Sequence, residues 1–369
     1  SKVIRKIRME KFAFIFHPIS IKDMEHVSPI MKYIPDRLIE AGLKLKRPFK
    51  VSHITGVRSE YAEAEGWFVG IPLTARQMVE LPEEFVMDRI IESGKIAQEL
   101  GAKIVGLGAF SSVIGDAGIT VAKNLDIAVT SGNSYTVATA LQGTKEAVTL
   151  MGKRLSDCRA VVVGASGSIG AACVRLLAKE VPHVTLVARH LEPLEDLAQE
   201  LLHKERCQVE VTDNIRFALK EADIVLTVTS AWHFLIEPED LKPGAVVCDV
   251  ARPRNVSKEV SVKRKDVLVI EGGIINIPGD VNFGFNFGFP PKTSYACMAE
   301  TRILALEKHY ENFSLGRSLD VSKVDLISQM AAKHGFSLAG FRNFERAITQ
   351  SEIDQVMHYA VENLAIHRG

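Results

Sequence analysis

The sequence contains no long uninterrupted apolar run. No stretch of about 18 apolar residues, the minimum for a transmembrane helix, occurs among its 369 residues. Residues 1–11 also lack the apolar segment of a secretory signal peptide. We therefore expect a protein that spans no membrane, is not exported and works in the cytoplasm.

An excess of charge of either sign is also missing, since 45 Lys and Arg residues balance 45 Asp and Glu residues. With 47% apolar and 24% charged residues, the composition is that of a globular protein and excludes long disordered or collagen-like segments. Nothing indicates a nucleic-acid binder. Basic residues do cluster in two places, as solvated surface or as a docking patch for an acidic partner. The clusters contain Lys2, Arg5, Lys6, Arg8 and Lys11, and Lys44, Lys46, Arg47 and Lys50.

Cysteine pairs of the C-x-x-C type are absent, so the five cysteines indicate neither a zinc site nor a disulfide framework. This usage fits a reducing compartment, and we expect no metal. Four of the cysteines lie in or beside predicted strands and helices, where a small buried thiol is common. We interpret these four as inert packing: Cys158, Cys173, Cys207 and Cys248.

The length suits two domains of average size, and no internal repeat, low-complexity segment or long linker is visible. In the first third, short apolar runs alternate with helical patterns, as in an α/β domain. Strands are predicted at residues 12–16, 67–71 and 103–107, and helices at 77–100 and 134–150.

The middle of the chain repeats a strand, helix, strand pattern, which predicts a parallel, doubly wound sheet of the Rossmann type. Strands are predicted at residues 160–163, 184–188, 224–229, 245–249 and 267–271, with a helix at 168–180. After Pro291 the pattern becomes helical, at 295–310, 323–334 and 352–367. We expect an α/β fold with a substrate and catalytic domain at residues 1–145, an NADP-binding Rossmann domain at 146–290, and C-terminal helices at 291–369 that pack back on the first domain.

A glycine-rich turn stands between the first strand and the first helix of the predicted Rossmann domain. In such a turn the first glycine allows a tight bend, the second lets the backbone approach a pyrophosphate, and the third lets the helix lie close on the sheet. The phosphates then meet unpaired N–H groups at the helix start. We predict that a dinucleotide binds here, at Gly164, Ala165, Ser166, Gly167, Ser168, Ile169 and Gly170, with Thr229 and Gly273 as further contacts.

The end of the second strand of this domain indicates which dinucleotide binds. An NAD site usually places Asp or Glu there to bind the ribose 2′-hydroxyl, but this strand ends in Ala188, Arg189 and His190. The planar guanidinium of Arg189 suits the 2′-phosphate of NADP, and the alternative is a plain surface arginine. We therefore predict NADP(H) as the cofactor.

Cys297 differs from the other cysteines because it follows a Gly- and Pro-rich stretch and stands where a helix opens. A helix start stabilises a thiolate, which is the nucleophilic form, so a catalytic role and inert packing both stay open. The loop before it presents aromatic side chains on one face of an extended segment, for core packing or for lining an acyl chain. These are Phe283, Phe285, Phe287 and Phe289.

Two polar loops, at residues 106–112 and 130–136, follow predicted strands of the first domain. In open α/β sheets, loops at the carboxyl ends of strands line the ligand crevice. Ser111, Asn133 and Ser134 are therefore candidate hydrogen-bond donors to a substrate. Ser134 and Thr136 are equally suited to cap a helix.

Together these motifs resemble the long-chain acyl-(acyl-carrier-protein) reductases, from about residue 100 to residue 334. In that family the cysteine that matches Cys297 receives the acyl group as a thioester, and NADPH then reduces it to a fatty aldehyde. The resemblance implies Cys297 as the nucleophile and acyl-carrier protein or acyl-CoA as the substrate. The chain departs from the family in its first hundred residues, at residues 252–255 and in the phenylalanine-rich loop. The matching segments are residues 108–112, 132–136, 164–170, 271–273, 295–300, 312–314 and 334–336, together with Arg189.

Three functions compete on this basis. The first is a thioester reductase in which the two polar loops hold the oxyanion. The fold also resembles shikimate and amino-acid dehydrogenases, so the second is direct hydride transfer to a small hydroxy or amino acid, with Lys123, Lys145 or His233 as the acid or base. The third is a nucleotide-binding regulatory protein without turnover. A homo-oligomer is compatible with each of them.

Overall fold

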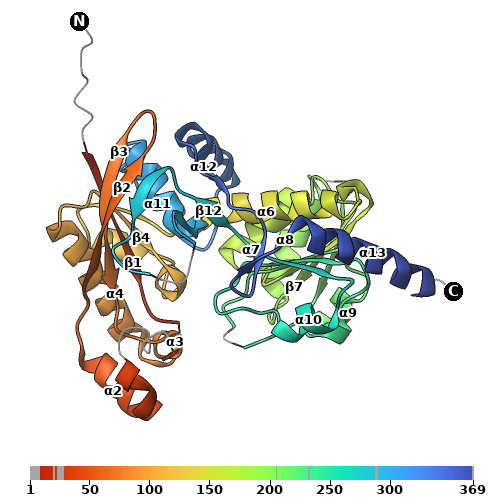
Figure 1. Ribbon diagram of the computed structural model, residues 1–369, viewed down its shortest axis with the longest axis horizontal. Coiled ribbons are helices and arrows are strands. Elements are labelled where there is room, and N and C mark those ends of the chain that lie inside the picture. The colour runs from red at the N-terminus through yellow and green to blue at the C-terminus, as the bar shows by residue number, and fades with distance from the viewer. Residues whose placement is uncertain are drawn as a thin grey trace, which may run out of the picture. The chain divides into compact units, whose positions relative to one another are not determined.

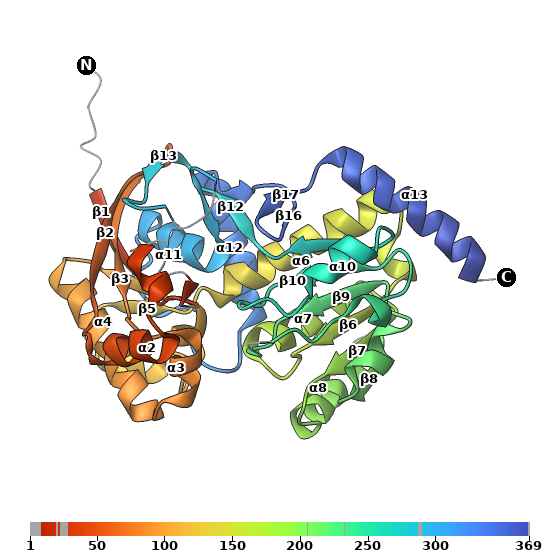
Figure 2. The ribbon, with the colours of Figure 1, turned by 60° about the horizontal axis from the view of Figure 1, so that its bottom comes forward.

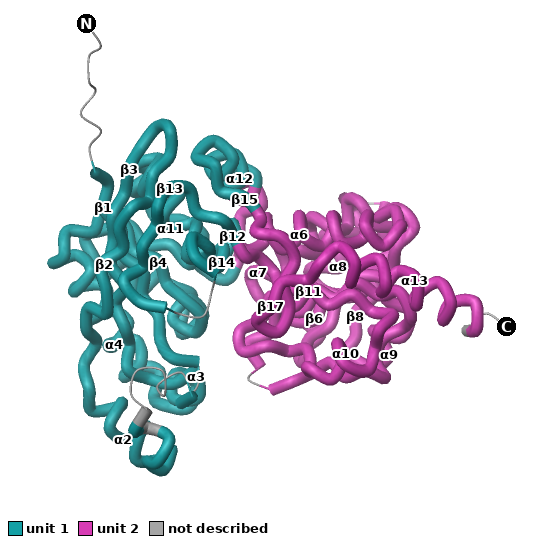
Figure 3. Tube along the Cα trace, viewed as in Figure 1, with its two compact units in different colours: residues 1–135, 275–317, 325–337 teal, residues 136–274, 318–324, 338–369 magenta. Residues whose placement is uncertain are grey.

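The computed structural model describes residues 9–19, 21–22, 29–204, 206–231, 233–286 and 290–367 (Figure 1). The chain forms two compact units, which Figure 3 colours separately. Unit 1 contains residues 1–135, 275–317 and 325–337, and unit 2 contains residues 136–274, 318–324 and 338–369. Each unit has a six-stranded sheet with helices, which confirms the predicted α/β fold class. Among the described helices, none is both long and apolar enough to cross a membrane.

The sheet of unit 1 has the strand order β13-β2-β3-β1-β4-β5. Strands β3, β1, β4 and β5 are parallel, whereas β2 and β13 run antiparallel to their neighbours. The three strands predicted in this region correspond to β1, β3 and β4. The strand bounds are β1 (Met9–Phe16), β2 (Phe49–Arg58), β3 (Glu63–Gly70), β4 (Ile104–Leu107), β5 (Ala128–Thr130) and β13 (Gly279–Asn282).

Different helices cover the two faces of this sheet (Figures 1 and 2). Ala13 and Ile15 of β1 belong to one apolar cluster with Val86 and Ile90 of α4 (Glu83–Glu99). Phe12, which points the other way because side chains alternate along a strand, contacts α11 (Ala296–Leu306). Helix α11 therefore lies over the parallel strands at the centre of the sheet.

The helix predicted at residues 77–100 is wrong in its extent, because two helices occupy this region. Helix α3 (Ala75–Glu80) ends before Leu81, and α4 begins after Pro82. A proline inside a helix lacks the N–H group for the backbone ladder, and its ring clashes with the preceding turn. At the start of α4 the missing N–H costs nothing, because the first N–H groups of a helix have no partner within it.

The sheet of unit 2 is wholly parallel, with the order β11-β10-β9-β6-β7-β8. Counted from β6 as the first strand, this is the 3-2-1-4-5-6 order of the doubly wound dinucleotide-binding fold. The parallel sheet predicted for this part is confirmed, and its five predicted strands correspond to β6, β7, β9, β10 and β11. The bounds are β6 (Arg159–Val163), β7 (His183–Val187), β8 (Gln208–Thr212), β9 (Ile224–Thr227), β10 (Val246–Asp249) and β11 (Leu268–Glu271).

The C-terminal helices do not all belong to unit 1, where we expected them to pack. Helices α11 and α12 (Val321–His334) carry most of their residues in unit 1, whereas α13 (Gln350–His367) belongs to unit 2. The reason is burial, since Ile353 and Ala360 of α13 lie in the main apolar cluster of unit 2.

The remaining elements connect or flank the two sheets. The helices are α2 (Asp36–Leu45), α5 (Ile119–Lys123), α6 (Asn133–Leu150), α7 (Ser168–Leu177), α8 (Glu192–Leu202), α9 (Ile215–Leu219) and α10 (Lys258–Lys263). Two small sheets are formed by β12 (Ile274–Asn276), β14 (Thr293–Tyr295) and β15 (Ser337–Leu338), and by β16 (Arg342–Asn343) and β17 (Arg346–Ala347).

A buried histidine joins three segments of unit 1. His334, at the end of α12, has one ring nitrogen 2.7 Å from the Ser59 hydroxyl in the β2–β3 turn and the other 2.9 Å from Glu307 after α11. The Ser59 oxygen also accepts the backbone N–H groups of Tyr61 and Ala62, as in a turn cap. Burial lowers the pKa of His334, and the nearby Glu307 carboxylate only partly offsets this effect.

We predict that His334 makes unit 1 less stable in mild acid. Because the folded protein holds His334 with a lowered pKa, the unfolded chain binds the proton more readily, and the free energy of unfolding falls as the pH drops below about 6.5. His334→Gln should weaken this fall and should cost about 1–3 kcal/mol at pH 7.5 through the lost hydrogen bonds. Urea unfolding at pH 7.5 and 5.5 measures both effects. The exposed His358→Gln is the control, and an equal pH effect in wild type and His334→Gln would contradict the prediction.

Candidate functional site

Cys297 stands in the first turn of α11, directly after β14 and Ala296. All five cysteines lie in the described part of the chain, and Cys297 is the one that is not buried. The other four are buried in unit 2, as packing residues would be. Partial exposure of the residue therefore distinguishes Cys297 from the other four cysteines, in addition to its sequence context.

The start of α11 touches the loop that follows β5. A side chain at Gly132 would place its Cβ atom 2.4 Å from the Cα atom of Cys297, and the φ angle of Gly132 is +76°. Both the close approach and the left-handed backbone require glycine. The polar loop at residues 130–136 is thereby held against Cys297.

Glu300, one helical turn after Cys297, fixes this contact. Its side chain is fully buried, and its carboxylate accepts hydrogen bonds from the Thr130 hydroxyl, from the Tyr135 N–H at 2.9 Å and from the Ser314 hydroxyl at 3.3 Å. Burial raises the pKa of Glu300, and these donors act in the opposite direction. Sequence reasoning did not single out Glu300, although a carboxylate on an otherwise apolar helix is a usable signal.

The predicted donors of the polar loops already have internal partners. The Ser111 hydroxyl donates to the Gly108 carbonyl at 2.7 Å, and the Ser134 hydroxyl lies 2.6 Å from that of Ser314. Asn133 is buried at the start of α6, and its N–H donates to the Ser131 hydroxyl at 3.4 Å. A role for Ser111, Asn133 or Ser134 in holding an oxyanion stays a prediction, and it would require these bonds to be exchanged for substrate.

The acidity of Cys297 is not that of a simple helix-start thiolate. Burial raises the pKa of the Cys297 thiol to about 12, although the backbone groups of Met298 and of Cys297 itself act in the opposite direction. Among charged groups, Glu300 raises the thiol pKa and Arg302 lowers it. The helix start does assist the thiolate, but it is outweighed by burial of the sulfur.

The phenylalanine-rich loop contributes to the core of unit 1. Phe283 is buried and packs against Phe68, and Phe285 stacks on Phe16 with 5.8 Å between the ring centres. Of the two alternatives drawn from the sequence, core packing therefore holds for these two rings. Two further rings of the loop, Phe287 and Phe289, lie outside the described residues.

In unit 2 the glycine turn joins β6 to α7 at the carboxyl edge of the sheet. Gly164 has a φ angle of +90°, and a Cβ atom at Gly170 would lie 2.2 Å from the Gly164 carbonyl oxygen. Gly167, the N-cap of α7, has no such neighbour, because its nearest contact would be 3.5 Å away. The first and third glycines are thus required by the protein itself, whereas a side chain at the second would meet no clash within the protein.

The other predicted cofactor residues lie at strand ends of the same unit. Arg189 is exposed, two residues after β7, the strand next to β6. Thr229 follows β9, the other neighbour of β6, and its hydroxyl donates to buried Asn255 at 2.7 Å. Gly273 follows β11 with a φ angle of +67°. The strand order reverses between β6 and β9, and such sheets bind ligands at that point.

The alternative acid–base residues are all at the surface. Lys123, Lys145 and His233 do not share the buried surroundings of Cys297, and Lys145 forms an ion pair with Glu180. The basic residues at 44–50 are exposed, while those at 2–8 lie outside the described residues. No group of three or more metal-ligating His, Cys, Asp or Glu side chains occurs in the described ranges.

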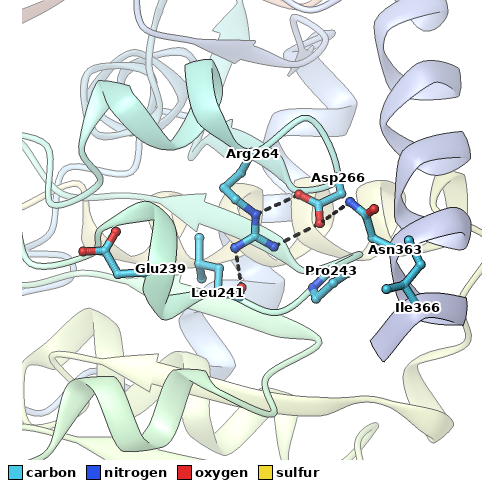
Figure 4. A pocket seen from close by; sticks show the side chains of 7 residues that line it. All are labelled: Glu239, Leu241, Pro243, Arg264, Asp266, Asn363 and Ile366. Carbon is cyan, nitrogen blue, oxygen red and sulfur yellow. Dashed lines mark hydrogen bonds and ion pairs between the residues drawn. The ribbon is translucent and has the colours of Figure 1, made fainter. Parts of the chain in front are cut away.

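A separate hollow of about 350 Å³ in unit 2 is lined by groups that already bind one another (Figure 4). Arg264 pairs with Asp266 at 2.8 Å and donates to the Pro238 carbonyl, and Asp266 accepts from Asn363 of α13 at 3.1 Å. Because these hydrogen bonds hold α13 in place, we interpret the hollow as structural.

Comparison with known proteins finds a family match in the middle of the chain and relatives along most of its length. The sequence model of the family described as "Shikimate / quinate 5-dehydrogenase" matches residues 145–271. Aminotransferase PigE of a Serratia species is 30% identical over 95% of this chain, which spans only 42% of that relative. Long-chain acyl-[acyl-carrier-protein] reductase of Synechococcus elongatus is 26% identical over 88% of this chain and 98% of its own length. Among solved structures, 5-ketofructose reductase of a Gluconobacter strain is 14% identical over 87% of this chain, with a TM-score of 0.37.

Proposed function

We propose that this chain is an NADP(H)-dependent oxidoreductase that reduces an acyl thioester, carried by acyl-carrier protein or coenzyme A, to an aldehyde through an acyl group bound to Cys297. The observation that carries the proposal is the position of Cys297. It is the one cysteine of the five whose residue is partly exposed, and it lies in the first turn of a helix that is packed against a polar loop at a strand end. The similarity to an acyl-(acyl-carrier-protein) reductase over 88% of the chain supports it.

In the first step the sulfur of Cys297 attacks the carbonyl carbon of the substrate thioester. The new C–S bond to Cys297 forms as the C–S bond to the carrier breaks, and the carrier leaves as a thiol with the proton that Cys297 gives up. In this proposal the oxyanion receives hydrogen bonds from backbone N–H groups at the start of α11 and from the loop at residues 130–136, which packs against Cys297 at Gly132.

In the second step the acyl group is reduced. When bound, the nicotinamide cofactor supplies the hydride to the thioester carbonyl carbon. The bond from that carbon to Cys297 then breaks, the aldehyde leaves, and the sulfur regains a proton. The Cys297 sulfur therefore carries negative charge twice, once when it attacks the substrate and once when the aldehyde leaves.

The residues of unit 2 fit a dinucleotide. Gly167 is the N-cap of α7 and would accept a Cβ atom without a clash, and the first N–H groups of this helix have no helical partner and suit a pyrophosphate. Arg189 is exposed at the end of β7, where a guanidinium suits a 2′-phosphate. On this basis we propose NADP(H) rather than NAD(H).

A second candidate is a dehydrogenase that acts directly on a small hydroxy or amino acid. The match of residues 145–271 to the shikimate and quinate dehydrogenase description favours it. That match covers the nucleotide-binding part and none of the residues around Cys297. The two candidates differ in whether an acyl group becomes covalently attached to the protein.

We predict that Gly167→Ala and Gly170→Ala fail in different ways. Gly170→Ala should lower the free energy of unfolding by a few kcal/mol, about the cost of overpacking, because its Cβ atom would meet the Gly164 carbonyl. Gly167→Ala should leave stability nearly unchanged and weaken NADPH binding at least about tenfold, because the methyl group fills the space for the pyrophosphate. Urea unfolding and NADPH fluorescence titration measure the two effects. Wild-type affinity in Gly167→Ala would rule out this binding mode.

Arg189→Ala should weaken NADPH binding by about 1.5–3 kcal/mol and leave NADH binding unchanged, because only NADPH carries the 2′-phosphate. Titration of each variant with both cofactors checks this. Arg154→Ala is the matched control, since Arg154 is an exposed arginine of the same unit that pairs with Asp157. An unchanged NADPH preference in Arg189→Ala would move the role to another residue.

Cys297→Ala should abolish both the acyl adduct and aldehyde formation, while NADPH binding survives because the glycine turn belongs to the other unit. Intact-protein mass spectrometry after mixing with a long-chain acyl-CoA, without NADPH, should show a hydroxylamine-labile adduct in the wild type only. Cys207→Ala, which removes a buried thiol, is the control and should still be acylated. Near-normal turnover of Cys297→Ala would favour the direct dehydrogenase.

A further inference from the structure

Arg302 is a fully buried cation whose hydrogen bonds are incomplete. Its side chain has no exposed surface, and one terminal nitrogen donates to the Ser294 hydroxyl at 3.0 Å. The Nε and second terminal nitrogen have no partner among the described residues. The guanidinium lies between two aromatic rings, with 5.6 Å to the ring centre of Phe12 and 5.0 Å to that of Phe283.

The guanidinium reaches back toward the start of α11. Arg302 is in the second turn of the helix, but it bonds Ser294, which precedes the helix in β14. Long side chains in a helix point toward its N-terminus, which accounts for this reach. Through Ser294, three residues before Cys297, the cation is directed to the end of α11 that carries Cys297.

A buried cation with two unpaired donors is costly, and buried charges in proteins are as a rule paired with an opposite charge. Nearby carboxylates do not meet this need. Glu300 is engaged by Thr130, Tyr135 and Ser314. Glu10, on the same face of β1 as Phe12, pairs with Lys308, which follows the other end of the helix. The anion that remains is the Cys297 sulfur in its ionised form.

We propose that Arg302 is the buried counter-cation of the Cys297 thiolate, and that its unpaired N–H groups stabilise the negative sulfur when the proton leaves. This role rests on the proposed function for its catalytic meaning, since a thioester reductase forms that anion twice. The thiolate attacks the substrate carbonyl in the first step, and it is the leaving group when the aldehyde is released in the second. Arg302 touches neither carbonyl nor cofactor, so it is a positioning residue that acts through Cys297.

Arg302 is the cation that lowers the pKa of the Cys297 thiol, against the effect of burial. Glu300 opposes the thiolate from the same helix. Of the strands packed on α11, β4 carries no charged residue, and Glu63 and Glu65 of β3 pair with Arg58 and Lys11. Burial lowers the pKa of Arg302 itself to about 9, and the Cys297 charge acts against this lowering, as expected for a mutual pair.

The test measures the thiolate of Cys297 without substrate or cofactor. The rate of alkylation by iodoacetamide, a neutral reagent that reacts with thiolate, is followed between pH 7 and pH 10 by mass spectrometry. Arg302→Met and Arg302→Gln should react about tenfold more slowly than wild type at every pH, the ratio that corresponds to one pKa unit. Arg302→Lys, which keeps the charge, should stay within about threefold. The thiolate absorbance at 240 nm, taken against the Cys297→Ala counterpart of each variant, separates ionisation from reagent access.

Arg264→Met is the matched control, because it removes another largely buried arginine that pairs with Asp266 in unit 2. Wild-type alkylation in a folded neutral Arg302 variant would overturn the inference. If neither neutral variant folds, Arg302→Lys decides: alkylation within about threefold of wild type supports a counter-cation, and a tenfold slower reaction overturns it, because the positive charge is still present. If the neutral Arg302 variants are alkylated more slowly but the wild type forms no acyl adduct with acyl-CoA, the inference about Arg302 stands and the thioester reductase is rejected.

Discussion

A carboxylate without exposed surface has to find its hydrogen-bond donors inside the protein, and Glu300 takes them from segments that are far apart in the sequence. Thr130 donates from the end of β5, Tyr135 from the first turn of α6, and Ser314 from the segment after α11. Loss of this carboxylate would leave several buried donors unpaired at once. The position of Cys297, one turn away on the same helix, is therefore set by a polar network rather than by apolar packing alone.

The same helix depends on two glycines that belong to the sheet and its loops. A Cβ atom at Gly106 of β4 would lie 2.0 Å from the Thr301 hydroxyl, and one at Gly132 would lie 2.4 Å from the Cys297 Cα atom. Helix α11 thus lies closer to the strands than any side chain at these positions would permit. This closeness buries the sulfur and raises its pKa, so the tight packing that positions the nucleophile also opposes its ionisation.

The parts of the molecule that follow from local pattern could be predicted. Runs of β-branched residues gave the strands around the glycine turn, because a doubly wound sheet buries them on both faces. Local pattern misplaced the helix at residues 77–100, where one proline outweighed a continuous amphipathic period. It also assigned α13 to the wrong unit, since the partner of an apolar helix face is a tertiary matter.

The candidate site shows the same limit. The sequence pointed to Cys297 and to the loop at residues 130–136, because each follows a predicted strand or opens a helix. It did not point to Glu300 or Arg302, because their importance comes from burial, and charged residues in a helix are usually on its exposed face. The backbone amides at the helix start lower the pKa of Cys297, as expected from the sequence. The net pKa is nevertheless raised, because the sulfur is buried, and that burial is visible only in the folded chain.

What separates the competing functions is therefore the chemistry of unit 1. A glycine turn on a 3-2-1-4-5-6 sheet serves many oxidoreductases and says little about the substrate. A direct dehydrogenase would gain nothing from a buried thiol on the same helix as an incompletely hydrogen-bonded guanidinium, and it would bear the cost of burying that cation. A thioester reductase needs a sulfur that resists ionisation at rest and accepts negative charge when substrate arrives or product leaves. The opposed effects of burial and Arg302 on Cys297 are those that such a sulfur requires.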